Sequence, residues 1–371
     1  MLSFLIINFP LSNMLDKNSK IYVAGHRGLV GSAIWNNLMQ RGYTNLVGRT
    51  HKELDLLDGV AVKKFFDEEK PYAVILAAAH VGGIMANSIY RADFIYNNLQ
   101  IQQNVIGESF RHGVKKLLFL GSTCIYPRDA EQPMKEEVLL TSPLEYTNEP
   151  YAIAKIAGLK MCESFNLQYG TNYIAVMPTN LYGPNDNFDL ERSHVLPAMI
   201  RKIHLAKCLM EGDMEAVRAD LNKRPVEGVN GESAEKEILD ILAKYGIHND
   251  HVMLWGTGKP MREFLWSEEM ADASVHVLLN VDFKDTYKAG DKDIRNCHIN
   301  VGTGKELSIF DVAMLIKKEI GFRGEIRWDA SKPDGTMRKL TDVTKLHNLG
   351  WHHKVEIDEG VHRMYKWYTG K

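Results

Sequence analysis

A tyrosine and a lysine four residues apart carry the strongest chemical signal in the chain. Tyr151 and Lys155 share one face of any helix that contains them, so the phenol and the ammonium can point into the same cavity. A neighbouring cation favours the phenolate, so we expect a lowered tyrosine pKa and a proton donor that works near neutrality. Ser122, further upstream, offers a hydroxyl for a substrate oxygen. The Tyr–Lys spacing alone also fits an ordinary surface pair on a helix.

A glycine-rich turn lies between an apolar run and a helical pattern. The apolar run covers residues 21–24, and the helical spacing of apolar residues ends near Gly42. Glycines permit a tight turn and a close approach of backbone N–H groups to a pyrophosphate, which the helix N-terminus also favours. The context predicts a dinucleotide site rather than a purely structural turn, although the spacing is G-x-x-G-x-x-G. The expected cofactor-binding residues are Gly25-His26-Arg27-Gly28-Leu29-Val30-Gly31.

Cations follow the second expected strand, where NAD-binding folds place a carboxylate for the ribose. Arg49, His51 and Lys52 stand there, and Arg27 lies inside the glycine turn. Such a cluster would bind a 2′-phosphate, so the sequence favours NADP(H) over NAD(H). The alternative is that these are solvated loop cations. Asp55 is expected either near the adenine or as part of a helix cap.

Apolar strands alternate with amphipathic helices through the first half of the chain. This pattern predicts an α/β fold, a doubly wound parallel Rossmann sheet with a smaller C-terminal α/β substrate lobe. Ligands of such sheets bind outside the carboxyl ends of the strands, where Gly25, Ala79, Ser122 and Pro178 fall. The expected strands are 21–24, 45–48, 73–79, 116–120 and 173–177, and the expected helices are 32–38, 59–69, 91–112 and 151–169.

Composition excludes several other classes of protein. The chain has 371 residues and a formal net charge of −2, so it lacks the global basic field of a nucleic-acid-binding protein. No run reaches the ~18–20 apolar residues of a membrane span, and residues 2–11 are expected to be a disordered or mis-started leader rather than a signal peptide. We expect a cytoplasmic protein without metal or disulfides, because no C-x-x-C pair occurs among Cys124, Cys162, Cys208 and Cys297.

Longer strings allow a family resemblance to be named. Besides the glycine turn and Tyr151–Lys155, they are 121–127, 178–184, 193–198, 255–258, 261–264 and 332–336. Together they resemble the extended short-chain dehydrogenases/reductases that act on nucleotide sugars. Within that family the resemblance is closest to the GDP-L-fucose synthases, NADPH-dependent 3,5-epimerase/4-reductases of GDP-4-keto-6-deoxy-D-mannose. It runs from about Lys20 to the C-terminus, and it implies a GDP-sugar substrate, NADP(H) and a homodimer.

The chemistry of such an enzyme needs two acid–base groups on opposite sides of the sugar, because a C4 ketone acidifies C3 and C5. The resemblance implies Cys124 as the base and His194 as the acid. Taken singly, they would be a buried thiol and a helix-capping histidine. The resemblance further implies that Tyr151 protonates the C4 oxygen, that Lys155 lowers its pKa and contacts the nicotinamide ribose, and that Ser122 binds the C4 oxygen.

Further contacts follow from the same resemblance. Lys202, Arg262 and Lys332 are expected to bind the pyrophosphate of the substrate, although the family usually has arginine at the first position. Trp255 is expected to stack on guanine or ribose, or else to pack in the core. Additional cofactor contacts are expected at Leu120, Gly121, Ser122, Thr123, Lys155, Pro178, Thr179, Asn180, Leu181 and His194.

The expected domain organisation has two lobes. Residues 1–19 form the leader, and 20–185 form the NADP-binding lobe, with a return segment near 262–302. Residues 186–261 and 303–371 form the substrate lobe. Its charged, helix-prone stretch 211–248 departs from the shorter family members. Amphipathic spacing there predicts a helix in a surface elaboration near the substrate lobe, or a lid or oligomer contact.

Two other readings stay open. One is another nucleotide-sugar enzyme of the same fold, such as a 4-epimerase, a reductase or a 4,6-dehydratase. A dehydratase would want an acidic residue after the serine, where this chain has Thr123 and Cys124. The other is a non-catalytic NADP-binding sensor, but such proteins typically lose the tyrosine or the lysine that this chain keeps.

Overall fold

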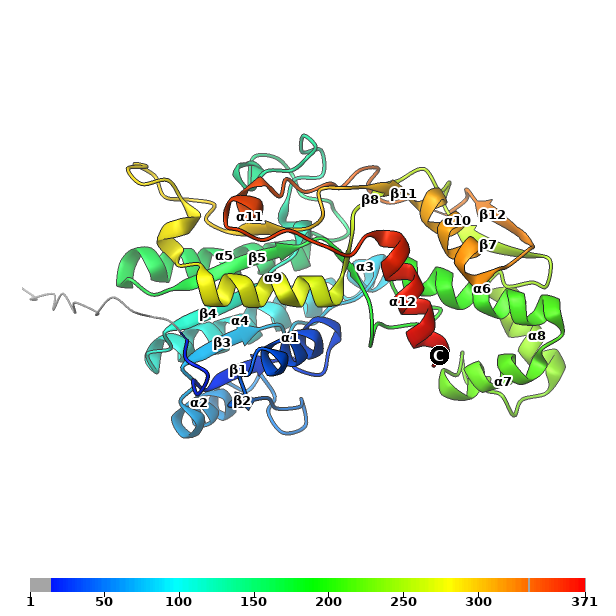
Figure 1. Ribbon diagram of the computed structural model, residues 1–371, viewed down its shortest axis with the longest axis horizontal. Helices are drawn as coiled ribbons and strands as arrows, with labels where there is room; N and C mark the ends of the chain where they lie inside the picture. The colour runs from blue at the N-terminus through cyan, green and yellow to red at the C-terminus, as the bar shows by residue number, and fades with distance from the viewer. Residues whose placement is uncertain (1–14, 333, 371) are drawn as a thin grey trace, which may run out of the picture.

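A six-stranded parallel sheet forms the first lobe of the computed structural model, which describes residues 15–332 and 334–370 (Figure 1). The strand order is β10-β5-β4-β3-β1-β2, so the chain reverses direction across the sheet between β1 and β3. The predicted doubly wound α/β fold is confirmed, and its ligand crevice is expected at that reversal. The strands are β1 (Ile21–Ala24), β2 (Leu46–Val47), β3 (Ala73–Leu76), β4 (Lys116–Leu120), β5 (Tyr173–Pro178) and β10 (Ile299–Val301).

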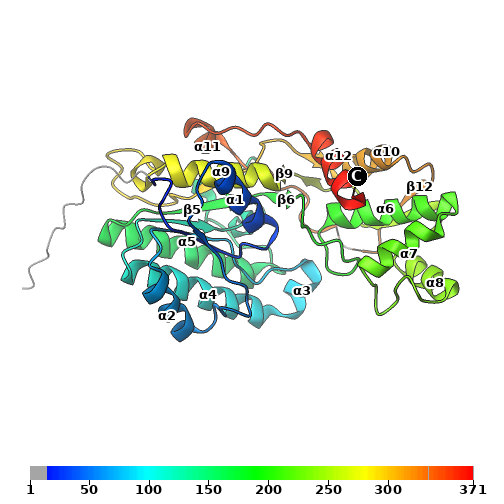
Figure 2. The same cartoon turned by 60° about the horizontal axis from the view of Figure 1, so that its bottom comes forward.

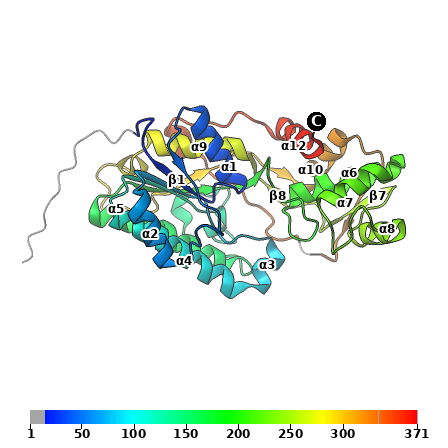
Figure 3. The same cartoon turned by 90° about the horizontal axis from the view of Figure 1, so that it is seen from below.

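Helices cover both faces of this sheet. Ile21 and Val23 pack with α1 (Leu29–Gln40) and α9 (Ser267–Asn280), whereas Tyr22 and Ala24 face the opposite layer. Figures 2 and 3 show α1 and α9 on one side of the sheet and α2, α4 and α5 on the other. Because both faces are buried, the strands are continuous apolar runs, which is why the sequence revealed them. The opposite layer consists of α2 (Gly59–Glu69), α4 (Arg91–Arg111) and α5 (Glu149–Tyr169).

Two predicted elements differ at their ends, and both differences lie at the crevice. The third strand ends at Leu76 rather than Ala79, because its partner β1 ends at Ala24, which pairs with Leu76. The first helix begins at Leu29, inside the glycine motif, with Gly28 as its N-cap. The chain therefore leaves the third strand earlier than predicted, whereas the loop after the first strand is shorter than predicted because the helix begins sooner.

The second lobe lies beyond the carboxyl edge of the sheet and has a separate core (Figure 1). The stretch 211–248 belongs to this core, so the expected surface elaboration is wrong: Val217, Leu221, Ile238 and Leu242 are fully buried there. The predicted amphipathic helix is confirmed, since Leu239 on its other face is 41% exposed. The elements of this lobe are α6 (Val195–Glu211), α7 (Met214–Lys223), α8 (Glu235–Lys244), α10 (Ile309–Ile320), α12 (Ile357–Thr369) and the parallel pair β7 (His251–Trp255) and β12 (Glu325–Asp329).

Several segments connect the lobes. The return segment brings α9 and β10 back to the first lobe, as expected. Leu346 and Trp351 also pack in the first core, although 303–371 was expected in the second lobe. The remaining elements are β6 (Asn180–Tyr182) paired with β9 (Phe264–Trp266), β8 (Met261–Arg262) paired with β11 (Leu307–Ser308), α3 (Ile84–Ile89), α11 (Thr344–Asn348) and the 3₁₀ turns Thr123–Ile125, Glu136–Val138 and Phe283–Thr286.

The expected leader lies mostly outside the described residues. Its last part belongs to the packed fold, because Leu15 is buried in the first core and its carbonyl accepts a hydrogen bond from the Tyr43 hydroxyl at 3.3 Å. In the part of the chain that the structure describes, no helix is both long enough and apolar enough to cross a membrane.

Candidate functional site

The glycine turn after β1 forms a backbone cradle. Gly25 has φ +85°, in the left-handed region that suits glycine. A Cβ on Gly31 would lie 2.0 Å from the Gly25 carbonyl oxygen, so α1 can approach the turn this closely only without a side chain. Gly28 caps α1 without a side-chain acceptor, which leaves the first turn available to an anion. The geometry fits the pyrophosphate of a dinucleotide.

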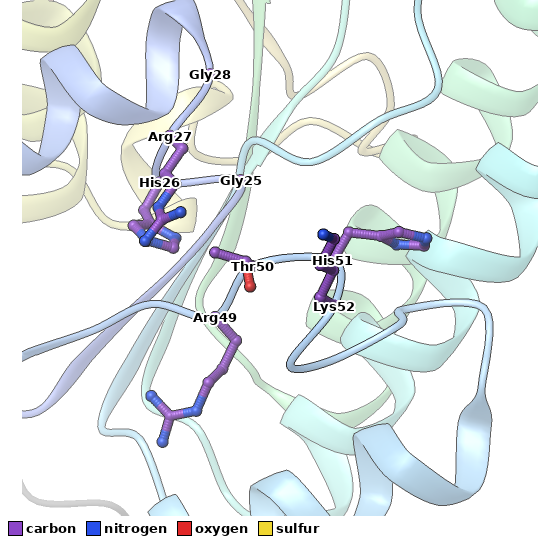
Figure 4. Close-up of a pocket in the computed structure, with 8 residues that line it drawn as sticks. All are labelled: Gly25, His26, Arg27, Gly28, Arg49, Thr50, His51 and Lys52. Carbon is purple, nitrogen blue, oxygen red and sulfur yellow. The ribbon is translucent and has the colours of Figure 1, made fainter.

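A cavity of about 490 Å³ lies between this turn and the end of β2 (Figure 4). The structure brings the predicted cations Arg27, Arg49, His51 and Lys52 together in its lining. Such a group of positive charges can hold a phosphate on an adenosine ribose. The lining residues are Gly25, His26, Arg27, Gly28, Arg49, Thr50, His51 and Lys52, a set without Asp55.

Arg49 is already paired with a carboxylate. Its guanidinium donates to Glu69 Oε1 at 2.6 Å and to the Gly48 carbonyl at 2.9 Å, and Figure 4 shows it pointing away from the glycine turn. Glu69 also pairs with Lys20 at 3.1 Å. The sequence did not predict this partner, because the carboxylate lies on the far end of α2.

Ser122 and Cys124 lie together where β4 ends. The backbone N–H of Cys124 donates to Ser122 Oγ at 3.2 Å, which caps the short 3₁₀ turn that starts at Thr123. Both side chains are half-buried, so they remain reachable from the carboxyl edge of the sheet. The Gly121 N–H donates to the Val176 carbonyl at 2.8 Å and fixes this turn to β5.

The predicted Tyr–Lys pair lies on α5 against the same edge. Lys155 Nζ donates to the Leu120 carbonyl at 2.8 Å and lies 5.7 Å from the centroid of the Tyr151 ring. The two side chains therefore lie near each other on α5, with Lys155 held at the end of β4. Burial lowers the pKa of Lys155 to about 7.

The expected lowering of the tyrosine pKa is wrong. Burial raises the pKa of Tyr151 well above its ordinary value, and the charge of the Cys124 thiolate raises it further. The ammonium does not offset this, because Lys155 hydrogen-bonds to a carbonyl and is itself only partly protonated at neutral pH. The phenol of Tyr151 therefore keeps its proton at neutral pH.

A second lysine, which the sequence did not single out, contacts the thiol. Lys339 Nζ lies 3.5 Å from Cys124 Sγ, and both residues are half-buried. Lys339 follows the string 332–336 by three residues, so the only signal in the sequence was a cation close to a family motif.

His194 lies at the N-cap of α6, where the second lobe begins. Its side chain is exposed, but protein atoms around the imidazole desolvate it, and this lowers the pKa of His194 below its usual value. The contacts described for Ser122, Cys124, Tyr151 and Lys155 do not include it. The structure therefore joins four of the five predicted catalytic residues and places the fifth on the facing lobe.

The predicted substrate residues fall into two groups. Lys202 is only 7% exposed, and burial lowers its pKa to about 8, while burial also lowers the pKa of Arg262 on β8. Trp255 is 57% exposed at the end of β7, with Lys332 Nζ 5.7 Å from the ring centroid. Packing of Trp255 in the core is thus excluded, and its indole is available for stacking.

The remaining expected cofactor residues line the same edge of the sheet. Leu120 and Thr123 flank the turn after β4, and Pro178 ends β5. The Thr179 N–H donates to the Val301 carbonyl at 3.0 Å, and the Asn180 amide donates to the Glu263 carbonyl at 2.8 Å, just before Leu181. Within the described residues, no group of three or more His, Cys, Asp or Glu side chains could hold a metal ion.

Known proteins match this arrangement. The model of the "NAD dependent epimerase/dehydratase family" matches residues 21–220. "GDP-L-fucose synthase 1" of Arabidopsis thaliana is 49% identical over 98% of this chain and 97% of its own length.

Solved structures agree with this match. A "GDP-6-OMe-4-keto-L-xylo-heptose reductase" from C. jejuni is 48% identical over 96% of this chain and 99% of that one, with a TM-score of 0.90. "MlghC, GDP-mannoheptose C4 reductase" from Campylobacter jejuni, solved with NADP bound, is 46% identical over the same shares, with a TM-score of 0.85. The glycine cradle, the Tyr–Lys pair and these similarities agree: the chain belongs to the NAD dependent epimerase/dehydratase family.

Proposed function

We propose that the protein epimerises GDP-4-keto-6-deoxy-D-mannose at C3 and C5 and then reduces C4 with NADPH, which gives GDP-L-fucose. The observation that carries the proposal is the half-buried Cys124 beside Ser122 just after β4, on whose last carbonyl Lys155 of the Tyr151–Lys155 pair is held. A reductase of a preformed ketone needs no thiol at this place. The name of the Arabidopsis relative supports the same activity.

Epimerisation requires removal of a proton beside the ketone and its return to the opposite face. Cys124 acts as the base, because its sulfur lies at the carboxyl edge of the sheet with the hydroxyl of Ser122. Ser122 donates a hydrogen bond to the C4 oxygen and stabilises the enolate that forms there. His194, at the N-cap of α6 on the facing lobe, returns the proton on the other face.

Reduction uses the same residues around C4. When bound, NADPH supplies the hydride. Tyr151 donates the proton to the C4 oxygen, and its raised pKa suits this direction because the phenol is protonated before the reaction. Lys155, with Nζ held on the Leu120 carbonyl, would hydrogen-bond to the cofactor ribose.

The cofactor is NADP(H), and the glycine cradle with its cations supports this assignment. A Cβ would fill the space at Gly31, and the cavity beside the turn collects Arg27, His51 and Lys52. We propose that these three side chains bind the 2′-phosphate. Arg49 lies at the edge of the same cavity and stays paired with Glu69.

The GDP half is assigned to the second lobe. Lys202 is buried without a described carboxylate partner, so its charge suits the pyrophosphate, which would raise its lowered pKa. Arg262 would bind the same group. Trp255, exposed beside Lys332, is proposed to stack on guanine or ribose.

A homodimer in the cytoplasm completes the proposal. The face formed by α4 and α5 exposes large apolar side chains, which a second copy would cover: Tyr96, Ile153, Leu167 and Tyr169 are each 42–67% exposed. The four cysteines are all free, which suits a reducing compartment.

A second candidate is reduction at C4 alone. The two Campylobacter structures at 46% and 48% identity are named as reductases of GDP-heptoses. In both cases the match extends over 99% of the Campylobacter chain. Such an activity would use Tyr151, Lys155 and Ser122 but would leave Cys124 and His194 without a role.

One experiment separates these functions. GDP-4-keto-6-deoxy-D-mannose is incubated with NADPH in D₂O, NADPH absorbance is followed, and the product is analysed by NMR for deuterium at C3 and C5. Oxidation of NADPH with deuterium at both carbons supports the proposal. A Cys124→Ser variant should lose the deuterium, whereas Cys208→Ala, a buried thiol of α6, serves as the control. Oxidation without deuterium would assign the chain to simple reductases, and no oxidation with any GDP-keto sugar would refute both functions.

A further inference from the structure

The contact between Lys339 and Cys124 is a feature of the site that the proposed mechanism does not yet use. Nζ lies 3.5 Å from Sγ, although the two residues are 215 positions apart in the sequence. Arg338, its neighbour in the chain, forms an ion pair with Glu306 instead. The two adjacent cations thus have different partners, and the one that is less exposed faces the sulfur.

Hydrogen bonds fix the backbone on the C-terminal side of Lys339 to the loop that follows Cys124. The Leu340 N–H donates to Gln132 Oε1 at 2.7 Å, and the Met134 N–H donates to the Leu340 carbonyl at 2.8 Å. The Asp342 N–H then donates to the Met134 carbonyl at 2.9 Å. These bonds form a short parallel bridge between Met134 and Thr341. They fix the extended segment on which Lys339 lies.

A buried carboxylate fixes the same strand from the other side. Glu263 is fully buried, and its Oε2 accepts from the Thr341 N–H at 3.0 Å and from Thr341 Oγ1 at 2.7 Å. Its Oε1 accepts from the N–H groups of Thr303 and Gly304 at 2.6 and 2.8 Å. The segment that presents Lys339 is therefore held between the loop after Cys124 and the buried Glu263, which follows Arg262 of β8.

We propose that Lys339 is a positioning residue that holds the thiolate of Cys124 at the carboxyl edge of the sheet for proton abstraction. This rests on the proposed function, in which Cys124 is the base. A thiolate, rather than a thiol, takes up a proton, and a neighbouring ammonium stabilises that form. In the step itself the carbon–hydrogen bond of the sugar breaks and a sulfur–hydrogen bond forms. The ammonium keeps its protons throughout.

Alkylation of the full-length protein by iodoacetamide tests this without any sugar. The rate at Cys124 is followed from pH 6 to pH 10 by mass spectrometry of the peptide that contains it, which separates it from the buried Cys162, Cys208 and Cys297. Loss of an opposite charge within about 4–6 Å of an ionisable group displaces its curve of rate against pH by about one pH unit or more. For Lys339→Met we therefore expect a rate at pH 7 at least about tenfold lower and a curve displaced to higher pH.

Matched variants make the result specific. Lys339→Arg retains a cation and should keep most of the rate, which also guards against a variant that fails to fold. Arg338→Gln removes the neighbouring cation that pairs with Glu306, and it should leave the curve unchanged. Lys339→Met should in addition slow deuterium exchange at C3 and C5 and move its pH dependence in the same direction.

The outcomes distinguish the two proposals. If Lys339→Met is alkylated like the wild type at every pH, the inference is overturned, and a raised KM for the GDP-sugar would then make this lysine a substrate contact. If the alkylation curve moves but no GDP-keto sugar exchanges deuterium in the wild type, the contact stands and the proposed function fails.

Discussion

Gly31→Ala tests the cradle on which the cofactor assignment depends. The new Cβ would lie 2.0 Å from the Gly25 carbonyl oxygen and 2.7 Å from the Gly25 carbonyl carbon. Non-bonded heavy atoms rest at about 3.5 Å, so α1 and the turn must separate by about 1.5 Å. The turn is also crowded by the chain after β3, because a Cβ built on Gly25 would lie 2.8 Å from the Ala78 nitrogen.

We expect Gly31→Ala to lower the free energy of unfolding by about 1–3 kcal/mol, which is typical of overpacking. That corresponds to a fall in Tm of several degrees, since about 1 kcal/mol moves the Tm of a large domain by about 2–4 °C. NADPH affinity should fall about tenfold or more, because the displaced N–H groups are those that approach the pyrophosphate.

Gly28→Ala is the matched control. Its Cβ would lie at an ordinary 3.5 Å from the same Gly25 oxygen, so the free protein should keep its Tm. Thermal unfolding without ligand and fluorescence titration with NADPH measure both variants. A Gly31→Ala protein with the Tm and the NADPH affinity of the wild type would refute the steric reasoning and, with it, the cradle.

Other predictions concern the titrating groups and the cations. Tyr151→Phe should slow NADPH oxidation by about 10²-fold or more while deuterium still enters C3 and C5, and equal loss of both by NMR would contradict the division of roles. Burial lowers the pKa of Lys155 to about 7 in the folded protein, whereas the unfolded chain holds that proton to higher pH. The contribution of Lys155 should therefore make the free energy of unfolding rise with pH above pH 7, by at most about 1.4 kcal/mol per pH unit. Urea unfolding at pH 7, 8 and 9 should show a smaller slope for Lys155→Met, and an unchanged slope would argue against burial as the cause. Affinity for GDP in calorimetry should fall as the pH rises through about 8, where Lys202 loses its proton, but not in Lys202→Arg. Arg49→Ala should raise the KM for NADPH more than that for NADH, and equal effects would remove Arg49 from the 2′-phosphate site.

Local patterns predicted the scaffold well. The strand at 116–120 and the helix at 59–69 were predicted at their observed bounds, because apolar runs and a capping Asp58 are visible in consecutive residues. The Tyr151–Lys155 pair was equally accessible, since one helix fixes its geometry.

Long-range features were not predictable in this way. The contact between Lys339 and Cys124 joins segments far apart in the sequence, and no spacing rule connects them. The direction of the Tyr151 pKa shift depends on whether burial or a charge dominates, which only the packed structure decides. The apolar helix face that contains Ile238 and Leu242 could be predicted from the sequence. The core of the second lobe, against which this face packs, could not.

The path of the last segment of the chain has a consequence for biosynthesis. Trp351 completes the core around the sheet, and Val361 and Met364 of α12 complete the core of the second lobe. During translation, the core around the sheet stays incomplete until Trp351 has left the ribosome, and the core of the second lobe stays incomplete until α12 has left it. We therefore expect a premature stop codon before residue 351 to leave both cores unfinished.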